Sequence, residues 1–149
     1  MLNQVAAVCI HAAAQMYALP PPLIEAVLAV EGGRRGTVSR NVDGSEDLGP
    51  AQINTFWLPT LARQYAVPPE EVRHFLIHDD CFNVAISAWI LRSEIDRAGD
   101  FWTGVSRYHS RTPQRAGADL RKIVAKIVEL FGPGVFDAAS PPDRHAPRR

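Results

Sequence analysis

Glu31 is the residue whose setting in this sequence most favours acid–base chemistry. It ends the apolar stretch PPLIEAVLAVE, and two glycines follow it directly. A carboxyl group there is partly withdrawn from water, and the partial negative charge at the end of a helix also disfavours its ionised form. Both effects raise the pKa of a glutamic acid, which can then still donate a proton to a leaving oxygen near neutral pH. On position alone, a solvated glutamate at a helix end is the simpler interpretation.

The segments on either side of Glu31 must form the framework that positions it. Residues 23–31 are expected to form a largely buried helix, entered through the three prolines at 20–22 and ended by Gly32, because glycine adopts left-handed caps at little cost. Residues 33–52 are rich in Gly, Ser, Asn and Asp and contain an Asp-Gly pair. This composition is typical of an irregular loop or a short β-hairpin, which would lie beside the acid.

Helical patterns account for most of the remaining chain. The predicted helices span about residues 3–17, 54–65, 80–98, 100–109 and 113–131, with a short one after Pro68. The sequence therefore predicts a mainly α protein with one domain over residues 1–132. Residues 133–149 are rich in proline and basic residues, and we expect them to form a flexible tail.

Composition and charge narrow the classes of partner. Sixteen basic residues balance sixteen acidic ones, which gives no electrostatic reason to expect nucleic acid or an anionic membrane surface as the main partner. No apolar run approaches the roughly 20 residues that a membrane-spanning helix needs. The first residues also lack the charged region of a signal peptide, so no export signal is visible in this chain.

Two features invite a metal site, and neither has the required spacing. Cys9 and Cys81 lie far apart and no CxxC is present, so they are either two buried thiols or one disulfide. The segment 41–47, NVDGSED, faintly resembles a calcium loop but lacks the twelve-residue spacing with a closing glutamate. A turn held by Asp and Asn side chains is the preferred interpretation, and we expect no metal and no cofactor.

Several blocks of the sequence, in order and at matching spacing, resemble one family over about residues 3–131. The chain is similar to the small lytic transglycosylases with a lysozyme-like fold that accompany type III and type IV secretion, conjugation and pilus systems. The matching text is VEGGRRGTVSRNVDGSEDLGPAQIN, WLPTLA, HDDCFNVAISAWIL and DFWTGVSRYHSRTP. The resemblance implies a lysozyme-like single domain with a short hairpin loop after the catalytic helix.

The resemblance also implies roles for individual residues. Glu31 would be the acid/base, Ser39 would lie near it, Gln52 would line the sugar cleft, and the hydroxyl of Tyr108 would contact the glutamate. Two departures stand out: the family's Glu-Ser pair is here Glu-Gly, and its Gly-Leu-Met-Gln string, at residues 49–52, is here Gly-Pro-Ala-Gln. The first loses a hydroxyl beside the acid, and the second shrinks an apolar wall of the sugar site.

The implied activity is the cleavage of peptidoglycan glycan strands with 1,6-anhydro-MurNAc ends, in the periplasm. Secretion or pilus proteins are the expected protein partners. Cys9 and Cys81 match cysteines of the family, and the substrate lies outside the cytoplasm, so the resemblance favours a disulfide between them. Two alternatives stay open. One is a lysozyme-type muramidase in which Asp47 or Glu46 guides a water, and the other is a non-catalytic module that binds cell wall or secretion machinery.

The three tryptophans, Trp57, Trp89 and Trp102, all fall within predicted helices. Core packing is the expected role of each. A platform on which a sugar ring stacks is the alternative, and the sequence does not distinguish among the three.

Overall fold

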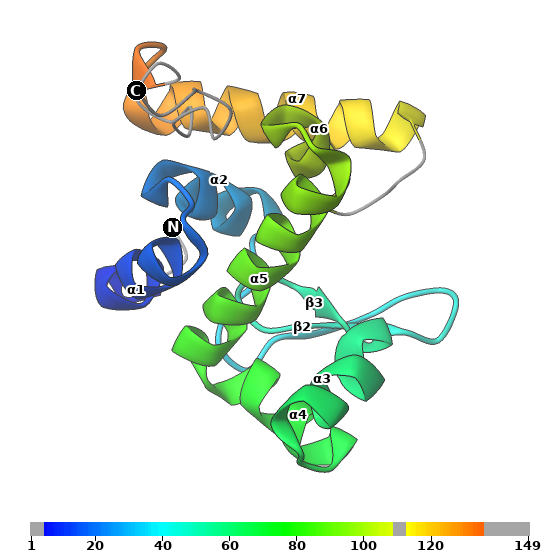
Figure 1. Cartoon of the computed structure of the whole chain (residues 1–149). Coiled ribbons are helices and arrows are strands. Elements are labelled where there is room, and N and C mark those ends of the chain that lie inside the picture. Colours follow the sequence, from blue (N-terminus) through cyan, green and yellow to red (C-terminus); the bar gives the residue numbers. More distant parts are fainter. Residues whose placement is uncertain (1–4, 109–112, 136–149) are drawn as a thin grey trace, which may run out of the picture.

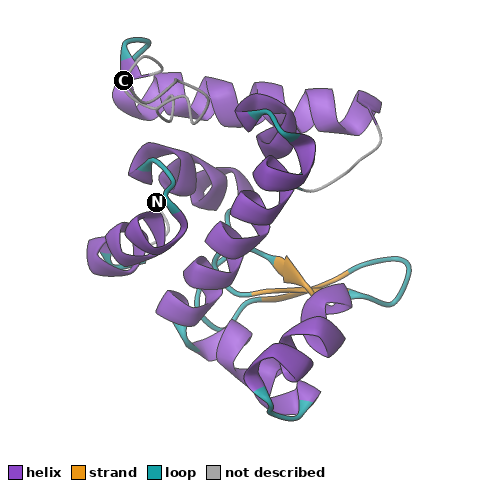
Figure 2. Ribbon diagram, in the orientation of Figure 1, coloured by secondary structure: helices purple, strands orange, loops and turns teal. Residues whose placement is uncertain are grey.

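The computed structural model describes residues 5–108 and 113–135, and its fold is mainly α with one small sheet (Figures 1 and 2). The elements are α1 Ala7–Tyr17, α2 Pro21–Glu31, β1 Val38–Arg40, β2 Glu46–Leu48, β3 Ile53–Asn54, the 3-10 helix η1 Thr55–Trp57, α3 Leu58–Tyr65, α4 Pro69–His78, α5 Asp80–Ala98, α6 Phe101–Ser106 and α7 Pro113–Phe131. The predicted fold class, helices with a short hairpin after the helix that ends in Glu31, is confirmed.

The long helix α5 runs through the middle of the molecule (Figure 1). It contacts α1 on one side and α6 at its end, while α7 lies across α2 and α6. The three strands form an antiparallel sheet in the order β1-β2-β3, and α3 and α4 pack together beside it. The core fills the space around α5, where Ile86 and Leu91 are fully buried. Helix α7 thus lies across the C-terminal end of α5, and the sheet lies beside α5 nearer its other end (Figure 1).

Helix α2 places Glu31 at its last position. Pro21 and Pro22 suit the first turn of a helix, where their missing N–H groups have no partner to lose. Leu23, Ile24 and Val27 are buried and fix the helix against the core. Gly32 ends it in the left-handed region with φ 67°, as the sequence predicts, and its N–H donates to the carbonyl of Leu28 at 3.0 Å.

A disulfide joins Cys9 of α1 to Cys81 in the first turn of α5, with their Cα atoms 4.8 Å apart. This confirms the pairing that the family resemblance favours and ties the N-terminal helix to the central one. No helix in the described part of the chain is both long and apolar enough to cross a membrane. Most of the predicted tail, from residue 136 onward, lies outside the described residues, so its flexibility stays a prediction.

Three predicted helices differ from those in the structure. The first, expected from about residue 3, begins at Ala7, because the backbone of Ala6 is not helical. The segment expected as a helix from residue 54 begins as β3 and η1, because Asn54 is extended and its side chain accepts a hydrogen bond from the N–H of Phe56 at 2.9 Å. The segment expected as a helix over 100–109 ends at Ser106. The difference at residue 54 matters for the site, since it turns the chain from the sheet toward α3 beside the cleft described below.

Candidate active site

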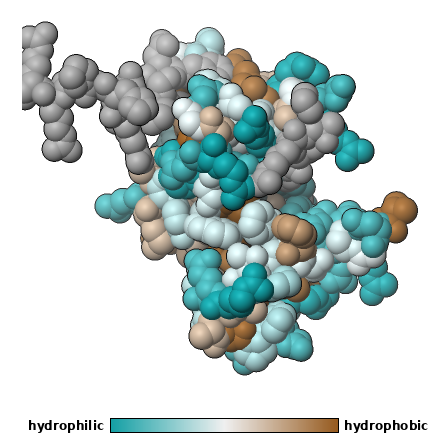
Figure 3. Space-filling model, turned by 45° about the vertical axis from the view of Figure 1, so that its right-hand side comes forward, coloured by the Kyte–Doolittle hydropathy of each residue, from teal (hydrophilic) through white to brown (hydrophobic). Residues whose placement is uncertain are grey.

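A cleft of about 800 Å³ is bounded by the sheet on one side and by α5 on another. The end of α6 and the start of α7 form its remaining boundary. Glu31, Gln52 and Tyr108, three of the residues predicted for the site, line it. Ser39 does not belong to its lining, although it pairs in the sheet with Asp47, which does. The predicted place of Ser39 near the glutamate therefore stays a prediction. Hydrophilic side chains cover most of the described surface in Figure 3, and hydrophobic ones gather in small separate patches.

Glu31 is half-buried and enters the cleft from the end of a rigid helix. The backbone beside it is closely packed, because a Cβ atom on Gly33 would collide with the carbonyl oxygens of Gly49 and Pro50 and with the side chain of Gln52. The missing side chain at position 33 thus lets the turn over residues 49–52 approach the end of α2. This contact brings Glu31 and Gln52 into one site.

Gln52 is held in an uncommon backbone conformation, with φ 52°. Its side-chain Nε2 donates to the carbonyl of Gly49 at 2.9 Å, and its backbone N–H donates to the same oxygen at 3.1 Å. The side chain is therefore fixed while it lines the cleft. A glutamine placed in this way can offer its amide oxygen to a hydroxyl or an acetamido N–H of a bound sugar.

A buried amide from α5 holds the turn that carries Gln52. Asn83 is fully buried; its Oδ1 accepts from the N–H of Ala51 at 2.8 Å, and its Nδ2 donates to the carbonyls of Leu48 and Leu76, each at 2.8 Å. A Cβ atom on Gly49 would collide with this amide. The sequence reasoning missed Asn83. The available signal was a polar residue on the buried stripe of a long helix, where an amide must be hydrogen-bonded.

Tyr108 closes the site from the end of α6. Its hydroxyl shares a hydrogen bond of 2.8 Å with the hydroxyl of Ser87, which is buried in α5. Burial of the phenol raises its pKa well above the usual range, the Ser87 hydrogen bond opposes that shift, and the negative charge of Glu31 raises it further. Tyr108 is therefore a neutral hydrogen-bonding group at any physiological pH. It lies close enough to Glu31 for the two groups to interact electrostatically.

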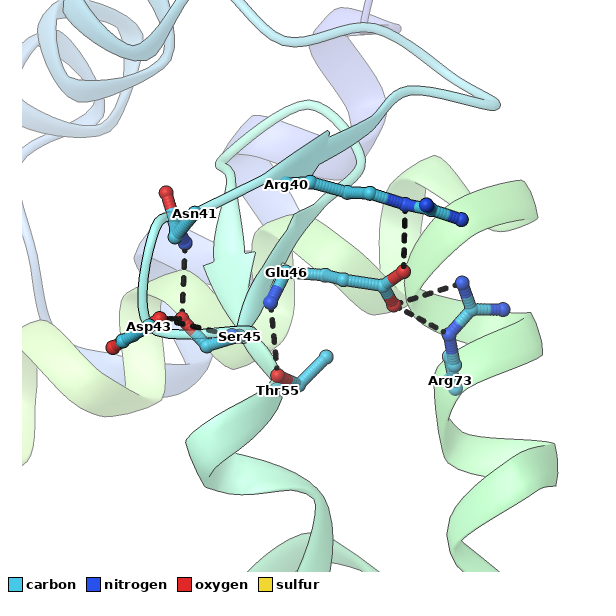
Figure 4. A network of polar contacts seen from close by, with 7 residues as sticks. All are labelled: Arg40, Asn41, Asp43, Ser45, Glu46, Thr55 and Arg73. Carbon is cyan, nitrogen blue, oxygen red and sulfur yellow. Dashed lines mark hydrogen bonds and ion pairs between the residues drawn. The ribbon is translucent and has the colours of Figure 1, made fainter.

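The loop acids that sequence reasoning considered as partners of Glu31 occupy different places. Glu46 does not line the cleft; its carboxylate accepts from Arg73 at 2.9 and 3.0 Å and lies 3.9 Å from Arg40 (Figure 4). Asp47 lines the cleft, and its two oxygens accept from the amides of Asn54 at 2.8 Å and Asn41 at 3.1 Å. Of the two, only Asp47 faces the space in which a substrate would lie.

Glu94 is a further acid that sequence reasoning overlooked. It is buried on α5, lines the cleft, and pairs with Arg97 one turn along the helix at 3.1 Å. The signal in the sequence was its spacing, since it lies four residues after the buried Ile90 and seven after Ser87, on the same face of the helix. A carboxyl group on such a face must be paired.

The hairpin tip is a turn held by its own side chains, as predicted. Asp43 Oδ1 accepts from the N–H and the hydroxyl of Ser45, at 2.9 and 2.6 Å, and Asn41 donates to the Ser45 hydroxyl at 3.1 Å (Figure 4). These bonds lower the pKa of the Asp43 carboxyl. Within the described residues, no group of three or more His, Cys, Asp or Glu side chains could hold a metal ion.

Aromatic side chains form the wall of the cleft next to the sheet. Trp57 lines the cleft and meets Trp89 edge to face, with ring centroids 5.5 Å apart. Phe56 also lines the cleft, meets Trp57 edge to face at 5.6 Å, and is 76% exposed. Trp89 and Trp102 pack against the core, the role expected of them. Trp57 does both, since it packs against the core and faces the cleft.

Comparisons with known proteins place this chain in a family. No protein-family model matches the chain. The invasion protein IagB of Salmonella typhimurium is 32% identical over 129 residues, which are 85% of this chain and 76% of IagB. Protein IpgF of Shigella flexneri is 31% identical over 124 residues, 83% of this chain and 78% of IpgF. A peptidoglycan-binding-like protein of Escherichia coli O157:H7 is 28% identical over 108 residues, 68% of this chain and 63% of that protein. The chain therefore belongs to the family of the invasion protein IagB and protein IpgF.

Proposed function

We propose that this protein is a lytic transglycosylase that cleaves peptidoglycan glycan strands, with Glu31 as its acid and base. The observation that carries the proposal is the placement of a half-buried glutamate at the end of a rigid helix, in one cleft with Gln52 and Tyr108. A relative named for peptidoglycan binding and another named for invasion support a cell-wall substrate and a role beside a secretion apparatus.

The proposed reaction needs one carboxyl group. Glu31 donates its proton to the oxygen of the β-1,4 bond between MurNAc and GlcNAc, and the C1–O bond breaks with its electron pair passing to that oxygen. The acetamido oxygen of the same MurNAc stabilises the positive charge at C1. The Glu31 carboxylate then takes the proton of the 6-hydroxyl as O6 bonds to C1. The product is 1,6-anhydro-MurNAc, no water is consumed, and Glu31 regains its proton.

The remaining acids of the cleft support this route over hydrolysis. A hydrolase needs a second carboxylate that activates water or attacks the sugar. Glu94 is paired with Arg97, and Glu46 is turned toward Arg73 outside the cleft.

The observation that favours a lysozyme-type muramidase is that two loop acids, Asp43 and Asp47, line the same cleft. Asp43 accepts hydrogen bonds from Ser45 in its own turn. The two oxygens of Asp47 accept from the amides of Asn41 in the hairpin and Asn54 in β3, which favours a structural role for Asp47.

The proposed location is the periplasm, where peptidoglycan is accessible. The disulfide between Cys9 and Cys81 supports it, because disulfides persist in oxidising compartments and are rare in the cytosol. Opening the wall locally for a secretion or pilus apparatus is the proposed physiological role, with the glycan strand as substrate and proteins of that apparatus as partners.

The substitution Glu31→Gln tests the catalytic assignment. Glutamine keeps the shape of the side chain and cannot transfer the proton, so we expect the release of soluble muropeptides from purified peptidoglycan to fall by at least about 10²-fold. Glu25→Gln is the matched control, because Glu25 lies on the same helix and does not line the cleft. Thermal unfolding measured on both variants separates lost chemistry from lost fold. Near-normal release by Glu31→Gln would remove the acid/base role.

A further inference from the structure

The cleft carries negative charge where it meets the hairpin. Asp43 and Asp47 line it there, and the hydrogen bonds from Ser45 keep the pKa of Asp43 low, so this acid is ionised at neutral pH. The nearest basic side chain of the sheet, Arg40, is directed to Glu46 and does not line the cleft (Figure 4). This end of the cleft therefore repels anions.

The α6–α7 end of the cleft carries positive charge. Arg107, which follows α6, and Arg115, in the first turn of α7, both line it. Glu94 lines the cleft too, but its charge is balanced by Arg97. Among the described residues, no carboxylate lies within ion-pair distance of Arg107 or Arg115. Two guanidinium groups that have no ion-pair partner among the described residues thus line the same cleft, which also holds the carboxyl of Glu31.

The stability of the fold does not account for these arginines. Arg115 lies near the start of α7, where the helix dipole disfavours a cation, and the first turn of α7 contains no acidic residue to offset it. Asp119, one turn further along, lines a separate hollow together with Lys122 and Glu31. Arg107 is half-buried, which costs a charged group part of its hydration. Both features fit a site that binds an anion.

We propose that Arg107 and Arg115 bind a carboxylate carried by the muramyl unit of the strand, and that this contact sets the direction in which the strand lies in the cleft. The proposal rests on the proposed peptidoglycan substrate. GlcNAc has no carboxylate, whereas the lactyl group of MurNAc ends in one or continues into a peptide stem that bears several. Planar guanidinium groups match a carboxylate through paired hydrogen bonds. The acidic hairpin end would exclude the same group, so the two ends select one orientation.

The test measures binding with Glu31→Gln as the parent protein, so that no ligand is cleaved. The ligands are soluble glycan strands with peptide stems, the same strands stripped of stems by an amidase, and a neutral chitooligosaccharide of matched length. Replacing both Arg107 and Arg115 by Gln should raise the dissociation constant about tenfold to a hundredfold for a carboxylate-bearing ligand and less than about threefold for the neutral one. Arg63→Gln is the matched control, since Arg63 is exposed on α3 outside the cleft.

Each outcome bears on the proposal. A loss restricted to stemmed strands supports it and identifies the stem carboxylates, and a loss that extends to stem-free strands supports it and identifies the lactyl carboxylate. The proposal is overturned if the double substitution changes the dissociation constants of all three ligands equally, or changes none of them. It is also overturned if the parent protein binds the neutral ligand as tightly as the stemmed strand. The single variants Arg107→Gln and Arg115→Gln supply the same comparison if the double variant unfolds. A failure of the proposed function gives a different result: the wild-type protein would bind the strands and not cleave them.

Discussion

The two walls of the cleft are built in different ways. Behind the α5 wall, which Ile90 and Glu94 line, Asn83 and Ser87 are fully buried and hydrogen-bond to other elements, the turn beside Gln52 and the hydroxyl of Tyr108. On the hairpin wall, the polar side chains are exposed or half-buried and bond mainly within the hairpin or to the adjacent Asn54, as Asn41 does with Ser45.

This difference separates the residues that hold the site from those that contact the ligand at its rim. When a buried polar group loses its hydrogen-bond partner, the fold loses the full free energy of desolvating the group that is left unpaired. An exposed polar group in the same position forms a hydrogen bond with water instead. Substitutions on the α5 wall should therefore reduce stability and activity together. Substitutions on the hairpin wall and the adjacent aromatic rim should change binding and leave the fold intact.

The largest expected effect on stability comes from the anchor of α5. Replacing Cys9 and Cys81 by serine opens a loop whose ends are 72 residues apart, and the chain-entropy model gives a loss of about 4 kcal/mol in the free energy of unfolding. Denaturant unfolding of the wild-type and double-serine proteins measures it. Identical midpoints would show that the bridge does not stabilise the α5 wall.

Asn83→Ala should have the next largest effect. It removes the acceptor of the Ala51 N–H and leaves the carbonyls of Leu48 and Leu76 without that donor, so we expect a loss of roughly 3 kcal/mol and a large fall in activity as Gln52 loosens. Asn41→Ala is the control on the hairpin wall, where a loss below about 1 kcal/mol is expected. Equal destabilisation by the two variants would refute the contrast between the walls.

Phe56→Ala should have the smallest effect on the fold. The ring is 76% exposed, so its removal should change the free energy of unfolding by less than about 0.5 kcal/mol. We expect it to weaken chitooligosaccharide binding about three- to tenfold through lost stacking on a sugar face, measured by the fluorescence of Trp57 beside it. Phe75→Ala, an exposed phenylalanine on α4 outside the cleft, is the control. Equal binding by both variants would leave Phe56 without this role.

The sequence predicts the features that depend on local signals. Gly32 predicts the end of α2, and the prolines predict its start to within two residues, since α2 begins at Pro21 where residue 23 is expected. The helix expected over residues 80–98 has the observed bounds of α5. Asn83 escaped because its partners Ala51 and Leu48 lie more than 30 residues away in the sequence. Glu94 and Phe56 escaped because the burial of one and the exposure of the other, both in the lining of the cleft, are defined only in the folded chain. The orientation of a loop acid also depends on residues that are distant in the sequence. Glu46 is held by Arg73, 27 residues further along the chain.

The measurement that tests the central claim most directly is the mass of the muropeptides released from purified peptidoglycan, before and after borohydride treatment. The account predicts 1,6-anhydro products, lighter by one water than reducing muropeptides and inert to borohydride, because Glu31 acts with the substrate's own acetamido group. Asp47→Asn should leave that product type unchanged, since the carboxylate of Asp47 holds the amides of Asn41 and Asn54. Reducible, water-containing products from the wild-type protein would contradict the account, and their loss in Asp47→Asn would identify Asp47 as the group that positions water.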